Sequence, residues 1–138
     1  MLQRLLQTFV TAATLTLVVA LPGRTAELVM VEQAGCVYCA AWDEQIAPIY
    51  PKTAAGTYAP LHRIDLRDPA PEGMQFVRPA VFTPTFILIG DEGEELGRIE
   101  GYPGEDFFWS LLEAMLIDKT EFDRAIVETP APAAKVRP

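Results

Sequence analysis

Cysteine, histidine and basic residues are scarce in this chain. It contains two cysteines, Cys36 and Cys39, and one histidine, His62. Two cysteines exclude a disulfide-rich scaffold, and three such side chains are too few for a self-contained four-ligand zinc site. The 11 Lys and Arg against 19 Asp and Glu give a net charge of −8. This balance argues against a nucleic-acid partner, because phosphate recognition needs a basic face.

The first residues have the pattern of an export signal. Arg4 is followed by 19 uncharged, mostly apolar residues that end before Arg24. This pattern predicts a signal peptide over residues 1–20, with cleavage after Ala20 or as late as Ala26, and a periplasmic or secreted protein. A retained membrane anchor stays open as an alternative, because the run nearly reaches the ~20 residues that span a bilayer.

The rest of the 138 residues suffices for one α/β domain, which we expect over 27–127. Short apolar or alternating segments predict strands at 27–33, 61–66, 81–89 and 94–100. Apolar residues at helical spacing predict helices over 39–49, 107–116 and 120–127. The Pro- and Ala-rich residues 128–138 predict a disordered tail.

The motif Cys36-Val37-Tyr38-Cys39 stands where the first strand gives way to a helix. Side chains at positions i and i+3 of a helical turn are neighbours, close enough to form a disulfide and to separate again. The helix N-terminus favours a thiolate on Cys36, which would attack a partner's disulfide. Cys39, one turn further on, would resolve the mixed disulfide.

Two other interpretations of the cysteine pair stay open. Two thiolates suit Cu(I), so a copper carrier is one alternative. A structural disulfide is the other, although closing so short a loop stabilises a fold little. A c-type haem site needs histidine after the second cysteine, and this chain has Ala40 there.

A proline interrupts the third predicted strand, in Thr83-Pro84-Thr85. Proline removes a hydrogen bond from a sheet, so its presence in an apolar strand needs a reason. A cis peptide bond before Pro84 is one reason, because cis bonds are mainly a property of proline and mark functional turns. A proline on an edge strand is the alternative.

The order strand, GCVYC, helix, strand, TPT, hairpin, glycine loop and helix resembles the thioredoxin family over residues 27–117. The segments MVEQAGCVYCAAWDEQIAPIYPKTAAG and GRIEGYPGEDFFWSLL are similar to the SoxS-type periplasmic thioredoxins of sulfur-oxidation clusters. The resemblance implies a thioredoxin-like fold, a central mixed sheet of about four strands flanked by helices. It also implies that Cys36 is the nucleophile, Cys39 the resolving thiol, Pro84 a cis-proline against them and Thr83 its substrate-pairing neighbour.

The resemblance further implies a dithiol–disulfide oxidoreductase with no cofactor besides its own disulfide. Its partners would be a protein disulfide, such as that of a sulfur-carrier protein, and a membrane electron donor, and it would act as a monomer. The threonine before Pro84 favours a reductase, with oxidase, isomerase and Cu(I) carrier as the alternatives.

The chain departs from thioredoxin around the motif. Met30 stands at the position of the family's buried acid and Leu61 at that of its lysine partner. Glu32 is therefore the candidate proton acceptor, with a solvated strand end as the alternative.

Val37, Tyr38, Thr83 and the glycine loop are expected to form an apolar substrate groove around the nucleophile. Tyr102 in that loop would anchor a partner. The alternative is that Tyr102 packs in the core.

Overall fold

The computed structural model describes residues 26–123, which form a sheet of four strands in the order β2-β1-β3-β4. The strands are β1 (Glu27–Glu32), β2 (Leu61–Asp65), β3 (Thr85–Ile89) and β4 (Glu95–Glu100). β1 runs parallel to β2, whereas β3 is antiparallel to both β1 and β4. The expected mixed sheet in an α/β fold is therefore confirmed.

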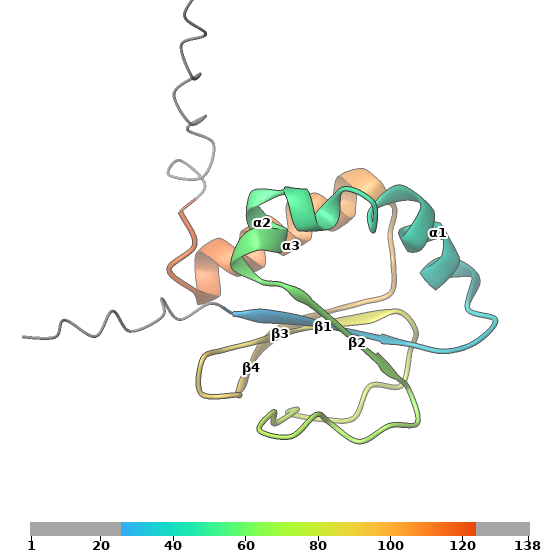
Figure 1. The fold of residues 1–138 in the computed structure, drawn as a ribbon, viewed down its shortest axis with the longest axis horizontal. Helices are drawn as coiled ribbons and strands as arrows, with labels where there is room; N and C mark the ends of the chain where they lie inside the picture. Colours follow the sequence, from blue (N-terminus) through green and yellow to red (C-terminus); the bar gives the residue numbers. More distant parts are fainter. Residues whose placement is uncertain (1–25, 124–138) are drawn as a thin grey trace, which may run out of the picture.

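The helices cover one face of this sheet (Figure 1). They are α1 (Val37–Gln45), the 3₁₀ turn η1 (Tyr50–Lys52), α2 (Ala54–Tyr58) and α3 (Glu105–Lys119). The main core lies between them and the sheet, with Trp42 at its centre. The Trp42 ring lies 5.4 Å from that of Phe86 and 5.8 Å from that of Phe108.

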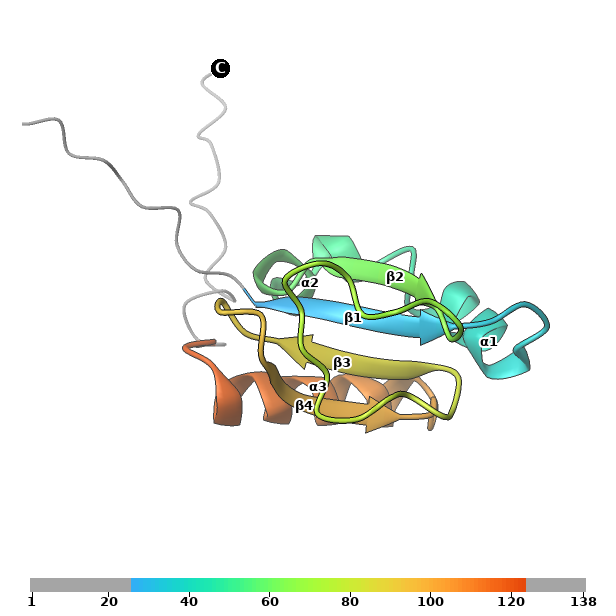
Figure 2. The same cartoon turned by 90° about the horizontal axis from the view of Figure 1, so that it is seen from below.

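The long connection between β2 and β3, residues 66–84, covers the opposite face (Figure 2). A second cluster is buried there, formed by alternate residues of β1 and β3: Val29, Val31, Ile87 and Ile89. Because β1 and β3 are buried on both faces, their sequences are almost continuously apolar rather than alternating.

Several element boundaries differ from the sequence predictions. β3 begins at Thr85 rather than at residue 81, because Pro84 has no N–H to offer the ladder. The helix predicted over 39–49 ends at Gln45, and η1 and α2, which follow it, were not predicted. α3 extends beyond the predicted 107–116 at both ends.

The helix predicted over 120–127 is wrong for residues 120–123, which are not helical. Its remaining residues, the predicted signal peptide and the predicted tail lie outside the described part of the chain. Within residues 26–123, no helix has the length and apolar character needed to cross a membrane.

Candidate active site

Sheet topology brings three separate segments to one end of the molecule. Val31 near the end of β1 pairs with Thr85 at the start of β3, and Thr85 pairs with Glu100 at the end of β4. The cysteine motif follows β1, the Thr83–Pro84 bond comes just before β3, and the glycine loop follows β4. The backbone N–H of Gly101 donates to the Pro84 carbonyl over 2.7 Å, which ties two of the three together.

Cys36 and Cys39 form a disulfide with their Cα atoms 5.2 Å apart. Cys36 is the N-cap of α1, and its sulfur accepts a hydrogen bond from the backbone N–H of Cys39 over 3.1 Å. The first N–H groups of a helix have no partner within the helix, so a sulfur at this position meets a donor and the positive end of the helix dipole. A thiolate on Cys36 would be stabilised by the same arrangement.

The two cysteines differ in accessibility. Cys39 is only 4% exposed and belongs to the main core, whereas Cys36 is half-buried at the surface. The Cys36 sulfur is therefore the more accessible of the two, and Cys39 is shielded from a protein disulfide. This geometry suits a two-step thiol–disulfide exchange.

The Thr83–Pro84 peptide bond is cis. The carbonyl of Phe82, on one side of Thr83, accepts from the Thr85 hydroxyl over 2.8 Å, and the Pro84 carbonyl is held by Gly101. In the described part of the chain, the backbone N–H and C=O of Thr83 itself have no hydrogen-bond partner. At this end of β3, the N–H and C=O of Thr83 are therefore able to form backbone hydrogen bonds with an extended segment of another protein.

An open apolar groove of about 420 Å³ lies beside the cysteine motif. The residues that line this Tyr38–Leu111 groove are Tyr38, Ile99, Glu100, Gly101, Tyr102, Pro103 and Leu111. Tyr38 is 60% exposed, and Val37 next to it is exposed as well. The groove joins Tyr38 to the 101–103 loop, as expected, and includes Leu111 of α3, which the sequence did not indicate; Val37, Thr83 and Cys36 do not line it.

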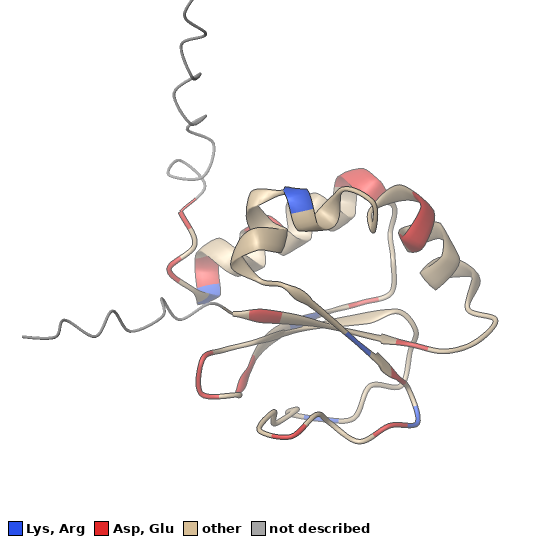
Figure 3. Cartoon of the chain, viewed as in Figure 1, with Lys and Arg blue, Asp and Glu red and all other residues tan. Residues whose placement is uncertain are grey.

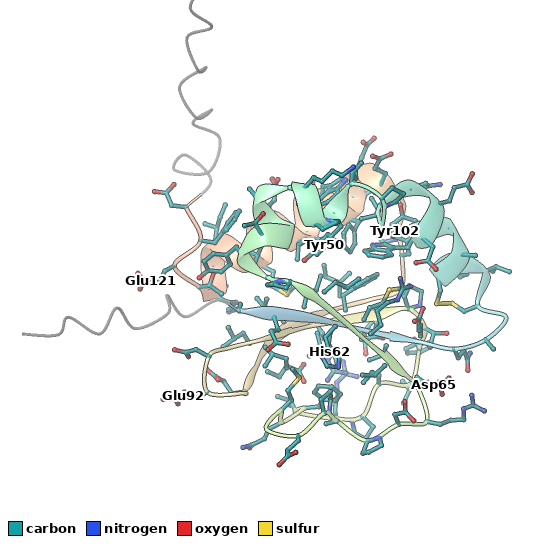
Figure 4. The ribbon with its side chains drawn as sticks, in the orientation of Figure 1. Tyr50, His62, Asp65, Glu92, Tyr102 and Glu121 are labelled. Carbon is teal, nitrogen blue, oxygen red and sulfur yellow. A yellow bond between two sulfur atoms is a disulfide. The ribbon has the colours of Figure 1, made fainter. Side chains whose placement is uncertain are left out.

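Tyr102 lies on the helix side of the sheet (Figure 4) and is only 9% exposed. Its ring packs against Phe108 at 6.0 Å, and its hydroxyl donates to Gln45 over 2.6 Å. Burial, and then the charge of Glu105, raises the pKa of its phenol. Tyr102 thus lines the groove with only a small part of its ring, and its expected role as a partner anchor stays a prediction.

Acidic side chains surround the site at a distance. Asp43 and Glu44 lie on α1, and Glu105 and Asp106 form the first turn of α3, on the two helices beside the groove (Figure 3). Such a field does not attract acidic partners.

Glu32, the candidate proton acceptor, is held in an ion-pair network at the end of β1. Both its carboxylate oxygens accept from Arg63, at 3.0 and 2.8 Å, and Arg63 also donates to Asp43 over 2.6 Å. These contacts, the one with Glu32 first, raise the pKa of Arg63. Met30, at the position of the family's buried acid, is fully buried in the core cluster that contains Cys39. The role of Glu32 stays a prediction.

The sequence did not predict the exposure of two apolar residues that lie next to Thr83. Val81 and Phe82 immediately precede Thr83 and are 63% and 60% exposed. They were counted as strand residues because the run 81–89 is apolar with a single break. The proline itself was the signal that could have separated them from the strand.

Among residues 26–123, no group of three or more His, Cys, Asp or Glu side chains is placed to hold a metal ion. His62 lies on β2 opposite Val29, exposed and 3.8 Å from Glu27, away from the cysteine end of the sheet.

Comparison with known proteins agrees with this geometry. The family model for a thioredoxin-like domain matches residues 16–116. The crystal structure of the periplasmic thioredoxin SoxS from Paracoccus pantotrophus in its reduced form is 53% identical, with a TM-score of 0.64. The match covers 66% of this chain and 95% of that one. Among curated proteins, none matches. The chain belongs to the thioredoxin-like family and is a dithiol–disulfide oxidoreductase whose redox pair is Cys36 and Cys39.

Proposed function

We propose that this protein is a periplasmic reductase of protein disulfides, in which Cys36 attacks and Cys39 resolves. The observation that carries the assignment of the two thiols is the hydrogen bond from the Cys39 N–H to the half-buried Cys36 sulfur, while Cys39 itself is buried. The direction, reduction, is inferred from the resemblance to thioredoxins with threonine before the cis-proline. A hydrogen-bond donor aimed at a sulfur stabilises the thiolate over the thiol. A stable thiolate at an accessible position is what attack on a disulfide requires.

The reaction transfers two electrons to the partner. The Cys36 thiolate attacks one sulfur of the partner's disulfide, a Cys36–partner bond forms, and the partner's other sulfur leaves as a thiolate and takes up a proton. The Cys39 thiol then loses its proton and attacks the Cys36 sulfur. The partner is released as a dithiol, and the Cys36–Cys39 disulfide remains.

Thr83 and Pro84 position the substrate in this scheme. An extended segment of the partner adds to the unpaired backbone of Thr83, as a strand adds to the edge of a sheet. Val37, Tyr38 and the Tyr38–Leu111 groove receive apolar side chains near the substrate cysteine. A two-thiolate Cu(I) carrier would have no use for either feature, which favours redox chemistry over metal transport.

The similarity to a periplasmic thioredoxin supports a periplasmic location, and the partner is inferred from the resemblance to thioredoxins of sulfur-oxidation clusters. Residues 1–20 act as the export signal, and the substrate is a periplasmic protein, such as a sulfur-oxidation carrier, whose cysteine must stay reduced. Each turnover leaves a disulfide on this protein, so a membrane donor returns two electrons to it. Glu32, four residues before Cys36, is the candidate acceptor of the Cys39 proton, directly or through water.

The reduction potential of the Cys36–Cys39 pair tests the direction of the reaction. The full-length purified protein is equilibrated in dithiol–disulfide buffers, and the fraction of free thiol is measured. A reductase is expected near −270 mV, whereas an oxidant lies near −120 mV. A value above about −180 mV would overturn the reductase assignment. A Cys36→Ser/Cys39→Ser variant gives the baseline.

A further inference from the structure

The segment that leads to Thr83 has few backbone bonds to the sheet. Gln75 is anchored by the Gly93 carbonyl at 2.8 Å and by the Glu95 N–H at 3.1 Å. From there to Thr83, in the described part of the chain, the backbone is held by side chains alone. The exposed residues Val81 and Phe82 belong to this stretch.

A buried ion pair on β4 provides most of these side-chain bonds. The side chains of Arg98 and Glu95 are only 8% and 5% exposed, and the guanidinium donates twice to the carboxylate, at 2.6 Å each. The same two groups reach the segment beside them. Glu95 accepts from the Val77 N–H over 2.8 Å, and Arg98 donates to the Arg78 carbonyl over 2.8 Å.

Two further bonds fix the rest of the segment. The Arg78 side chain donates to Glu100 on β4 over 2.7 Å. At the other end, the buried Thr85 hydroxyl holds the Phe82 carbonyl. The backbone is thus held by hydrogen bonds on both sides of Val81. The Phe82 side chain is exposed to solvent at a defined position next to Thr83.

Stability alone does not explain this ion pair. Burying two charges costs desolvation energy, and an apolar pair of similar volume is often as stable or more so. Here the two charged groups hold two main-chain atoms of a segment that has no helix or strand of its own. The Glu95–Arg98 pair therefore fixes the position of a loop rather than filling space in the core.

We propose that the Glu95–Arg98 pair is a positioning device that presents Val81 and Phe82 to the substrate, giving the protein a preference for disulfides flanked by apolar residues. A substrate strand that pairs with Thr83 continues past Phe82, so a side chain next to the substrate cysteine meets the Phe82 ring. Large exposed apolar residues beside a reactive group often mark a contact with a partner. This inference rests on the proposed function, since it takes Thr83 as the substrate-pairing residue.

Two peptide disulfides of the same length test the proposal, one with leucine beside each cysteine and one with serine. The reduced full-length protein is expected to have the higher kcat/KM with the leucine peptide. Phe82→Ala should lower the ratio of the two kcat/KM values about tenfold, mainly through KM. Arg98→Met should lower the ratio in the same direction, and the double variant should be no lower than Phe82→Ala, because both changes act on one contact.

A control variant tests whether the loss of preference is specific to Phe82 rather than common to exposed apolar residues. Ile117→Ala removes an equally exposed apolar side chain near the far end of α3 and should leave the ratio unchanged. If Arg98→Met does not fold, Glu95→Gln takes its place. An unchanged ratio in Phe82→Ala would overturn the proposal, and so would an Arg98 or Glu95 effect that is equal for both peptides. If the wild-type protein reduced neither peptide, the proposed function itself would fail.

Discussion

The two tyrosines near the active site show how a residue's surroundings decide its role. Tyr38 follows Cys36 by two positions, and most of its side chain is exposed. Tyr102 lies across the Tyr38–Leu111 groove, but its ring is buried and its hydroxyl is bonded to Gln45. Of the two rings, Tyr38 therefore offers a partner far more surface than Tyr102 does.

We therefore predict that Tyr38→Ala lowers kcat/KM for a protein disulfide by about five- to tenfold without lowering the melting temperature. The exposed ring contributes to binding rather than to the core. The measurement is reduction of one protein disulfide, combined with thermal unfolding of the same samples.

Tyr102→Phe is the matched control for that experiment. It removes a single hydroxyl bond and keeps the ring, so the expected cost is about 1 kcal/mol of stability with little change in kinetics. The interpretation of the groove would be contradicted if Tyr102→Phe lost more activity than Tyr38→Ala.

Chemistry-bearing residues were predictable from the sequence where a motif fixes their geometry. Cys36 and Cys39 are three apart at a strand–helix junction, which determines their distance whatever the rest of the fold does. Tyr102 lies in a loop, where no periodicity tells a buried side chain from an exposed one. Its place depends on Phe108 and Gln45, which approach only through tertiary packing.

At the level of elements, the strands were predicted better than the short helices. The ends of β1, β2 and β4 were predicted within one residue. β1 is a buried apolar run, β2 alternates apolar and polar residues, and β4 follows β3 as its hairpin partner. α2 has only five residues, too few for a helix that is stable alone. It forms because Thr53 caps it, accepting from the Gly56 N–H over 3.0 Å, and because the Tyr50 hydroxyl donates to the Ala59 carbonyl over 2.7 Å.

Gly56 shows a constraint on α2 that the sequence does not reveal. A Cβ atom at this position would lie 1.9 Å from the Tyr50 carbonyl oxygen. The helix therefore packs on η1 backbone to backbone, which only glycine permits here. From the sequence alone, a glycine in this segment would be interpreted as a helix breaker.

For the whole molecule, the ion pairs predict how stability depends on pH. Side-chain and backbone hydrogen bonds from Arg67 lower the pKa of Asp65 to about 2, and the hydrogen bond from Arg78 lowers the pKa of Glu100. A carboxyl whose pKa is lower in the folded protein stabilises it above the unfolded pKa of about 4, and this contribution is lost as the pH falls through the folded value.

We predict that the melting temperature changes little between about pH 5 and pH 8 and falls between about pH 4 and pH 2. At the alkaline end, burial raises the pKa of Tyr50 above its usual value. The stability that this phenol contributes is present below about pH 10 and is lost as the pH rises further. The measurement is the melting temperature across pH, with Asp65→Asn expected to flatten the acid limb. A melting temperature that stays constant down to pH 2 would contradict the prediction.

The central claim is that Cys36 attacks and Cys39 resolves, and trapping of the mixed disulfide tests it most directly. Cys39→Ser keeps the attacking thiol and removes the resolving one, so it is expected to remain covalently bound to a protein disulfide substrate through Cys36. Cys36→Ser leaves only the buried thiol and should trap little or nothing. The complex is measured by non-reducing electrophoresis and peptide mass mapping. The account predicts a stable adduct at Cys36 in the first variant, and a stronger adduct at Cys39 in the second would contradict it.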